Sequence, residues 1–117
     1  ADGGTRTAAI NGGYIALADA VCWAMRQGFI RENPIRQAVA AVSVGIIDGR
    51  IRLDLDYELD SRAEVDLNVA MTAAGRFVEL QGTGEKNTFS QDDLDSMLKA
   101  ARKGIRQIFK LQKEVLR

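Results

Sequence analysis

The sequence of 117 residues contains no histidine, a single cysteine and no excess of either charge. Without histidine there is no Ser-His-Asp or Cys-His catalysis, no HExxH metalloprotease site and no histidine-bound deaminase zinc. Cys22 alone makes neither an internal disulfide nor a cysteine-rich zinc site, which favours a reducing, cytoplasmic setting. The 16 basic and 16 acidic residues cancel, so composition gives no argument for nucleic-acid binding. Any chemistry must come from carboxylates, arginines, backbone amides and a hard metal ion.

Long apolar runs are also missing. No stretch approaches the roughly 20 consecutive apolar residues of a bilayer-spanning helix. The opening residues, Ala1-Asp2-Gly3-Gly4, lack the basic start and apolar segment of a signal peptide. We therefore expect neither a membrane span nor a secretion signal. The length predicts one domain or part of one, and we expect further chain to precede residue 1, because a glycine turn runs straight into an apolar helix.

The first expected element is a helix over residues 5–27. Alanines widen its apolar surface, so we expect it to be covered on more than one side. Gly12 and Gly13 each weaken a helix by roughly 1 kcal/mol, which predicts that another backbone passes close by. Cys22 and Trp23 are expected to lie in the core. The helical face is predicted from apolar residues at steps of three and four, namely Ile10, Tyr14, Leu17, Val21 and Met25.

Four segments carry strand patterns. The first is an almost unbroken run of small and β-branched residues, typical of a strand that is buried on both faces. Asp48-Gly49 follows it and predicts a two-residue hairpin turn, because both residues tolerate positive φ. The next two segments alternate apolar with polar residues, and the last follows a glycine turn and ends before Gly82. The expected strands span residues 38–47, 50–57, 65–72 and 76–81.

A second helix is expected to begin at Ser90. The Ser90 hydroxyl can cap this helix while Asp93 reaches back to the chain, which is the reciprocal pattern of a capping box. Basic residues gather toward its C-terminal end and complement the helix dipole. The order of helix, two β-hairpins and helix predicts an α+β fold for residues 1–117.

The turn into the first helix is a candidate anion site. Free backbone amides and the dipole at a helix N-terminus attract anions. Gly4 lets the backbone approach a ligand closely, Thr5 offers a hydroxyl, and Arg6 offers a planar fork for a phosphate. Pattern alone favours the plainer alternative, which is a threonine-capped helix with a solvated arginine.

Asp60 and Asp66 are candidate metal ligands. Six residues of straight strand would separate the two aspartates by roughly 20 Å, and six residues of helix would separate them by roughly 9 Å on different faces. They can converge only if Asp60 lies in a loop that doubles back and Asp66 points from the polar face of the next strand. Such a pair would suit Mg²⁺ or Mn²⁺. An acidic surface loop is the alternative that the pattern alone favours.

Several segments together resemble the ribonuclease PH family, over essentially the whole chain and in order. They are ADGGTRTAAI (residues 1–10), AAVSVGI (40–46), DLDY (54–57) with DS (60–61) and DLNV (66–69), and VELQGT (78–83) with FS (89–90). The match is to the C-terminal half of that family. The resemblance implies a fold related to ribosomal protein S5 domain 2 and a homohexameric ring built as a trimer of dimers.

The resemblance also implies an activity. Members of the family remove nucleotides from the 3′ end of RNA, notably precursor tRNA, with inorganic phosphate as co-substrate, and release nucleoside diphosphates. Carried over by residue, the phosphate-binding motif falls on Gly4, Thr5 and Arg6, and the catalytic and metal-binding pair falls on Asp60 and Asp66. A departure is Leu59, which stands where an acidic residue is expected.

Two further expectations follow from the resemblance. The N-terminal half of the family is absent from this chain, so we expect it to be supplied as another chain or to have been lost by cleavage. The alternative function is a non-catalytic RNA-binding or scaffold subunit of an exosome-like ring. That alternative would need neither the aspartates nor the Thr-Arg pair.

Overall fold

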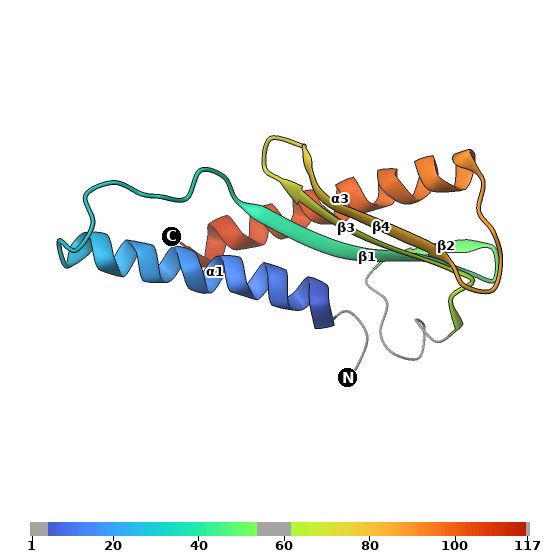
Figure 1. Cartoon of the computed structure of the whole chain (residues 1–117), viewed down its shortest axis with the longest axis horizontal. Helices are drawn as coiled ribbons and strands as arrows, with labels where there is room; N and C mark the ends of the chain where they lie inside the picture. Colours follow the sequence, from blue (N-terminus) through green and yellow to red (C-terminus); the bar gives the residue numbers. More distant parts are fainter. Residues whose placement is uncertain (1–4, 54–61, 117) are drawn as a thin grey trace.

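In a computed structural model, the described residues form two helices that enclose an antiparallel sheet of four strands (Figure 1). The structure describes residues 5–53 and 62–116, with side chains from residue 7 onward. The strand order in the sheet is β2-β1-β3-β4. The elements are α1 (Thr5–Arg26), β1 (Val39–Ile47), β2 (Arg50–Leu53), β3 (Val65–Thr72), β4 (Phe77–Gly84) and α3 (Gln91–Val115). The predicted α+β arrangement is confirmed.

Both predicted hairpins are present. Asp48 and Gly49 join β1 to β2 with φ angles of 52° and 72°, the positive values that the two-residue turn requires. Gly75, with φ of 84°, lies in the turn between β3 and β4. The last strand runs further than its predicted end, since Gly82 and Gly84 still pair with β3. A side chain on Gly84 would collide with the backbone oxygen of Asn87, so this strand end needs glycine.

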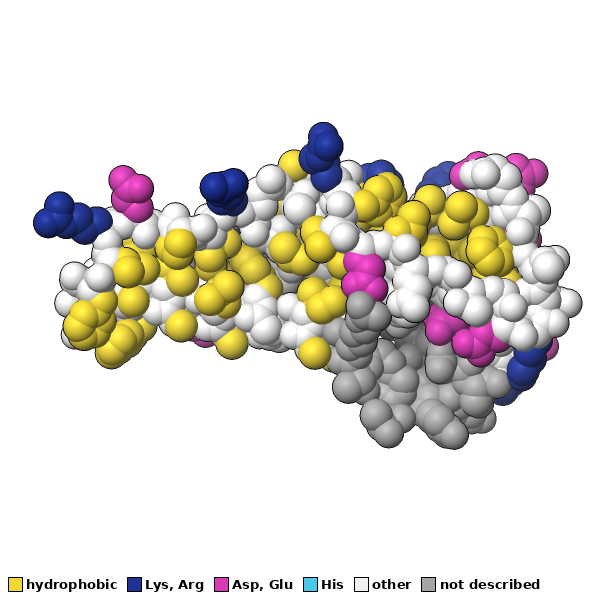
Figure 2. Space-filling model, viewed as in Figure 1, with side chains coloured by type: hydrophobic (Ala, Val, Ile, Leu, Met, Phe, Trp, Pro, Cys, Tyr) yellow, Lys and Arg dark blue, Asp and Glu magenta, His cyan; other side chains and the backbone are white. Residues whose placement is uncertain are grey.

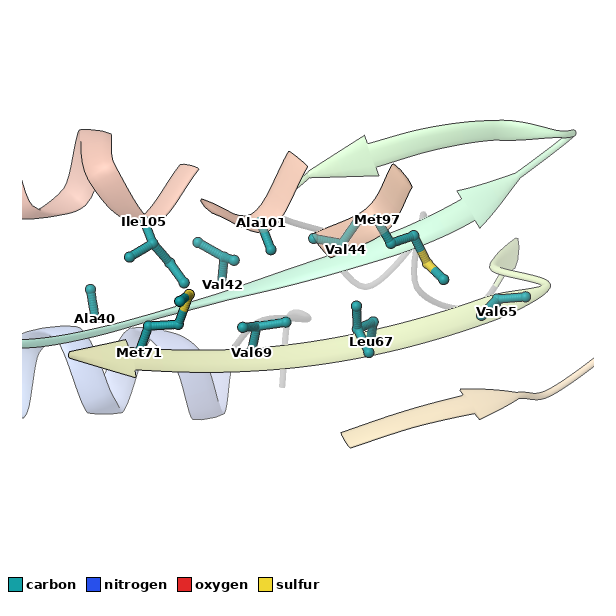
Figure 3. Packing of buried hydrophobic residues seen from close by; sticks show 10 residues of the cluster. All are labelled: Ala40, Val42, Val44, Val65, Leu67, Val69, Met71, Met97, Ala101 and Ile105. Atoms are coloured by element: carbon teal, nitrogen blue, oxygen red, sulfur yellow. The ribbon is translucent and has the colours of Figure 1, made fainter. Parts of the chain in front are cut away.

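The hydrophobic core lies between α3 and one face of the sheet (Figure 3). Alternate residues of β1 and β3 point toward α3, as a strand with period two dictates. Gly104 lets α3 lie close to β2, because a Cβ there would come within 2.7 Å of a methyl group of Leu53. The buried cluster consists of Ala40, Val42, Val44, Val65, Leu67, Val69, Met71, Met97, Ala101 and Ile105.

The start of α3 carries the predicted capping box. The Ser90 hydroxyl accepts the Asp93 amide at 3.0 Å, and the Asp93 carboxylate accepts the Ser90 amide at 3.0 Å. Two backbone donors at the helix end are satisfied in this way, which fixes where α3 begins against the sheet.

Side chains from both helices form hydrogen bonds to the outer edge of the first half of β1. β2 pairs with Val44–Ile47 of β1, so within the described residues no strand lies beside the earlier part of that edge. Asn11 of α1 accepts the Ala41 amide at 2.7 Å and donates to the Ala41 carbonyl at 2.8 Å. Gln112 of α3 donates to the Val39 carbonyl at 3.1 Å. These bonds satisfy backbone groups that burial would otherwise leave unpaired.

Helix α1 meets the sheet with a face that overlaps the predicted one at Tyr14 and Val21 but is turned part of the way around the helix. The stripe that faces the sheet also has steps of four and three, but it contains polar residues. The stripe consists of Thr7, Asn11, Tyr14, Ala18 and Val21. Leu17 and Met25, which were expected to be buried, are exposed by 55% and 36%. The prediction misplaced the face because it counted apolar residues alone.

Within the described residues α1 is covered on one side only, which does not bear out the expectation of cover on more than one side. Cys22 and Trp23 are exposed rather than in the core, because α1 continues past the end of the sheet (Figure 1). Among the described residues outside α1, no atom lies within 4 Å of a Cβ built on Gly12 or Gly13. Residues Thr7–Arg26 are long and apolar enough to cross a membrane by length and composition, so the sequence-based exclusion of a span does not hold on those grounds. The same property belongs to many core helices of globular proteins.

Replacing Gln112 by alanine tests whether its hydrogen bond to the edge of β1 stabilises the fold. Gln112 is 3% exposed, and its loss leaves the Val39 carbonyl without its donor. We expect the free energy of unfolding to fall by about 1–3 kcal/mol, measured by urea unfolding followed by circular dichroism. Gln107→Ala, at an exposed position of the same helix, should change it by less than about 0.5 kcal/mol. Equal losses for the two variants would contradict this role of Gln112.

Candidate functional site

The sheet face opposite α3 is polar at the end where β3 begins. On β3, Asp66 and Asn68 point to this face, since their neighbours Val65, Leu67 and Val69 point into the core. Through strand pairing, Asp66 and Asn68 each belong to a row of residues that runs across β1, β3 and β4. These rows are Gly45, Asp66 and Thr83, and then Ser43, Asn68 and Gln81.

Helix α1 lies over the same face and runs antiparallel to β1. Its middle contacts the start of β1, where Asn11 bonds to Ala41. One turn earlier, Thr7 is buried and lines a small cavity together with Asn68 and Ala70. Residues nearer the N-terminus of α1 therefore lie over residues nearer the C-terminal end of β1. The N-terminal end of α1 consequently points toward the row that contains Asp66.

In this arrangement the positive end of the α1 dipole and the negative carboxylate of Asp66 lie toward the same part of the sheet face. A helix N-terminus carries free amides and about half a positive charge. Asp66 supplies a carboxylate two residues before Asn68, which is a distance of roughly 7 Å along the strand. An anion at the helix end and a cation on the carboxylate would lie side by side. That is the chemistry expected of a site for a phosphate and a divalent metal ion.

The structure describes only part of the predicted site. Asp66 lies on β3, half-buried, on the face that α1 covers. Thr5 and Arg6 form the start of α1, while their side chains, together with Gly4 and Asp60, lie outside the described residues. Among the described residues, no three acidic or cysteine side chains gather into a metal cluster. The pairing of Arg6 with Asp60 and Asp66 stays a prediction.

Sequence reasoning missed residues that position this site. Asn11 holds α1 against β1, and Thr7 and Asn68 line a small cavity between the start of the helix and the sheet. The sequence contains a usable signal, because Thr7 and Asn11 are polar residues spaced by four within a mostly apolar helix. Polar residues at such positions mark a side that meets hydrogen-bonding partners rather than solvent.

Comparisons with known proteins bear on this site. Residues 37–104 match the model of the "3' exoribonuclease family, domain 2". The chain is 60% identical over 117 residues to ribonuclease PH from Nocardia farcinica, which covers 99% of this chain and 46% of the relative. It is 58% identical over 116 residues to ribonuclease PH from Corynebacterium diphtheriae, covering 99% of this chain and 48% of that relative. The chain thus spans about half the length of these relatives.

A solved structure agrees in fold. Rice (Oryza sativa) Rrp46 superposes with a TM-score of 0.78 at 18% sequence identity, and the match covers 98% of this chain and 49% of that protein. At this identity the likeness concerns the fold alone. The family model matches more than half of the chain and includes β1, β2, β3, β4 and the first part of α3. The chain belongs to the 3′ exoribonuclease family, and residues 37–104 correspond to domain 2 of that family.

Proposed function

We propose that this chain is the catalytic half of a phosphate-dependent 3′-to-5′ exoribonuclease, which trims the 3′ ends of precursor tRNA and releases nucleoside diphosphates. One observation carries the proposal: the N-terminal end of α1 points toward the row of the sheet that contains Asp66. The strong identity to proteins named ribonuclease PH supports it.

The attacking phosphate would bind at the start of α1. The backbone amides there, the hydroxyl of Thr5 and the guanidinium of Arg6 offer donors to phosphate oxygens, and Gly4 leaves room for close approach. These donors would offset the repulsion between the incoming phosphate and the scissile phosphodiester, which are both anions. They would also hold the two groups in position for attack.

The acidic pair would act on the other side of the same phosphoryl group. The carboxylate of Asp66, together with that of Asp60, fits the oxygen ligands that Mg²⁺ and Mn²⁺ prefer. When bound, such an ion supplies stabilisation of the charge that develops on the transferred phosphoryl group. Asp60 has an alternative role, the protonation of the departing ribose 3′ oxygen. In either case Asp66 would serve as a ligand of the ion.

Activity also requires more than this chain. The relatives are about twice as long, so we propose that the remaining part of the family's length completes the enzyme, on the same or on a second polypeptide. The proposal includes a cytoplasmic homohexamer, a trimer of dimers, that takes RNA as substrate. A non-catalytic, RNA-binding subunit of an exosome-like ring is the competing function, and the experiments below separate the two.

Arg6→Ala tests the phosphate site in the full-length polypeptide. Removing one charged donor costs about 1.5–3 kcal/mol, so we expect the KM for phosphate to rise by roughly 10- to 100-fold. The measurement is release of nucleoside diphosphates from a 3′-tailed tRNA as phosphate is titrated. Arg76→Ala, at the opposite end of the sheet, should leave that KM unchanged within about twofold. Nucleoside monophosphates produced without phosphate would contradict phosphorolysis.

Asp66→Asn tests the acidic side with little change in shape. We expect kcat to fall by at least about 100-fold, a loss on the order of that for one electrostatic contact to a transition state, and the Mg²⁺ needed for half-maximal rate to rise. RNA binding, measured by fluorescence anisotropy with EDTA present, should change little. Asp95→Asn, on the exposed surface of α3, is the matched control and should keep full activity. A wild-type enzyme that binds RNA without turnover would favour the scaffold function.

A further inference from the structure

One side of α3 carries only basic side chains over about four turns. At 3.6 residues per turn these side chains lie within an arc of roughly 100° around the helix. All of them are exposed, and the arc lies opposite the side that packs on the sheet, which contains Met97, Ala101 and Ile105. We call this set the basic stripe of α3, and it consists of Lys99, Arg102, Lys103, Arg106, Lys110 and Lys113.

The basic stripe has no acidic partner along the helix. No aspartate or glutamate stands between Asp95 and Glu114. Within the described part of the chain, no ion pair involves any of the six side chains. Like charges three and four residues apart destabilise a helix, whereas acidic residues at alternate positions would stabilise it. The reason for the stripe must therefore lie outside α3.

The helix dipole accounts only for the end of the stripe. Cations stabilise the C-terminal end of a helix, but this effect falls off within the last turn. Helix α3 ends at Val115, and Lys113 is the basic residue of its last turn. Lys99 and Lys103 lie roughly three turns or more before that end. The dipole gives no reason for cations at those positions.

The balanced composition is compatible with an uneven distribution of charge over the surface. Of the 16 basic residues of the chain, six belong to the basic stripe. Figure 2 shows the side of the molecule on which α1 lies, and there the basic side chains of the described residues lie along the rim. Helix α3 covers the other face of the sheet. A polyanion would therefore find its longest row of cations on α3.

We propose that the basic stripe of α3 binds the phosphate backbone of a base-paired region of the RNA substrate, away from the reacting 3′ end. The inference rests on RNA being the substrate, which is part of the proposed function. The stripe is roughly 21 Å long, and a nucleic-acid duplex of that length carries about a dozen phosphates. Contacts of this kind hold a nucleic acid in position without reading its bases.

The position of α3 favours a region away from the 3′ end. Helix α3 packs on the face of the sheet opposite the one to which Asp66 points, so the sheet lies between the stripe and the candidate site. A short single strand that reacts beside Asp66 stays on that face. A base-paired region is stiff and bulky, so it extends beyond the site and meets other surfaces of the assembled enzyme.

Arg102 is held in place before any ligand binds. Its guanidinium lies 5.2 Å from the ring centre of Phe77 and donates to the Gly75 carbonyl at 3.4 Å. Together with Arg106 it borders a hollow of about 200 Å³ beside the turn between β3 and β4. A guanidinium has five N–H donors, so most of them stay available to phosphate oxygens. A side chain that is already fixed loses less freedom when it binds.

An anionic membrane fits the stripe less well than RNA does. A helix that lies on a bilayer inserts its apolar side among the lipid headgroups. The apolar side of α3 is occupied by the core, where Met97, Ala101 and Ile105 pack against the sheet. An acidic protein is the other occupant, and the test below separates it from RNA.

The test compares two triple variants of the full-length polypeptide that lose the same charge. The stripe variant combines Lys103→Gln, Arg106→Gln and Lys110→Gln. The control variant changes exposed residues outside α3 and combines Arg31→Gln, Arg36→Gln and Arg50→Gln. Binding of a 3′-tailed tRNA and of a short single-stranded oligonucleotide is measured by fluorescence anisotropy, with EDTA present and phosphate absent, so that no turnover contributes.

We expect the stripe variant to bind the tRNA at least about 10-fold more weakly at about 0.15 M salt. The slope of log affinity against log salt concentration should fall by about 2–3, because each lost phosphate contact removes a little under one unit. Affinity for the short oligonucleotide should stay within about twofold. Glutamine has a similar helix propensity and relieves the repulsion, so the urea midpoint of the stripe variant should not fall.

Three results would overturn the inference. They are wild-type tRNA affinity in the stripe variant, an equal loss of tRNA affinity in the control variant, and an equal loss for the short oligonucleotide. An acidic protein or anionic vesicles that bind through the stripe while tRNA affinity is unchanged belong to the first result. Stripe-dependent tRNA binding in a protein without phosphorolysis leaves this inference standing while the proposed function fails. Phosphorolysis with wild-type tRNA affinity in the stripe variant does the reverse.

Discussion

The pair of hydrogen bonds between Asn11 and Ala41 is the interaction on which the arrangement of α1 depends. β1 contributes Ala40, Val42 and Val44 to the core, yet β2 covers only the second half of its outer edge. The amide of Asn11 acts as a short substitute for the missing strand, since it both donates and accepts at one residue. Because backbone groups have fixed positions along a strand, the contact also fixes where α1 sits lengthwise. The direction of the helix N-terminus follows from that position.

The elements themselves were predictable because their signals are local. Positive φ at Asp48 and Gly49, the reciprocal bonds of Ser90 and Asp93, and the apolar run of β1 each depend on neighbours in sequence. The end of β4 was placed too early, since glycine usually weakens a strand. Here Gly82 and Gly84 stay paired, and Gly84 is required by the close approach of the Asn87 backbone.

The orientation of α1 could not be obtained from apolar spacing. The predicted apolar stripe shares Tyr14 and Val21 with the face that meets the sheet, but that face is turned toward Thr7 and Asn11 and leaves Leu17 exposed. The stripe that contains Thr7 and Asn11 faces the sheet because Asn11 satisfies buried backbone groups that no apolar side chain can satisfy. Asp66 was assigned correctly to the polar side of its strand, because alternation along β3 is regular. The sequence around Asp60 has no such periodicity, so the approach of Asp60 to Asp66 rests on family resemblance.

One side of α1 is anchored by the amide hydrogen bonds of Asn11, so the two sides of the helix should differ in how many substitutions they tolerate. Apolar contacts accept many combinations of side chains of similar volume, so the exposed side can drift together with whatever packs on it. The asparagine contact accepts no such exchange, because either atom type alone would leave one group of Ala41 unpaired. Among homologous sequences, residue 11 should therefore vary less than the larger and less polar side chains around it.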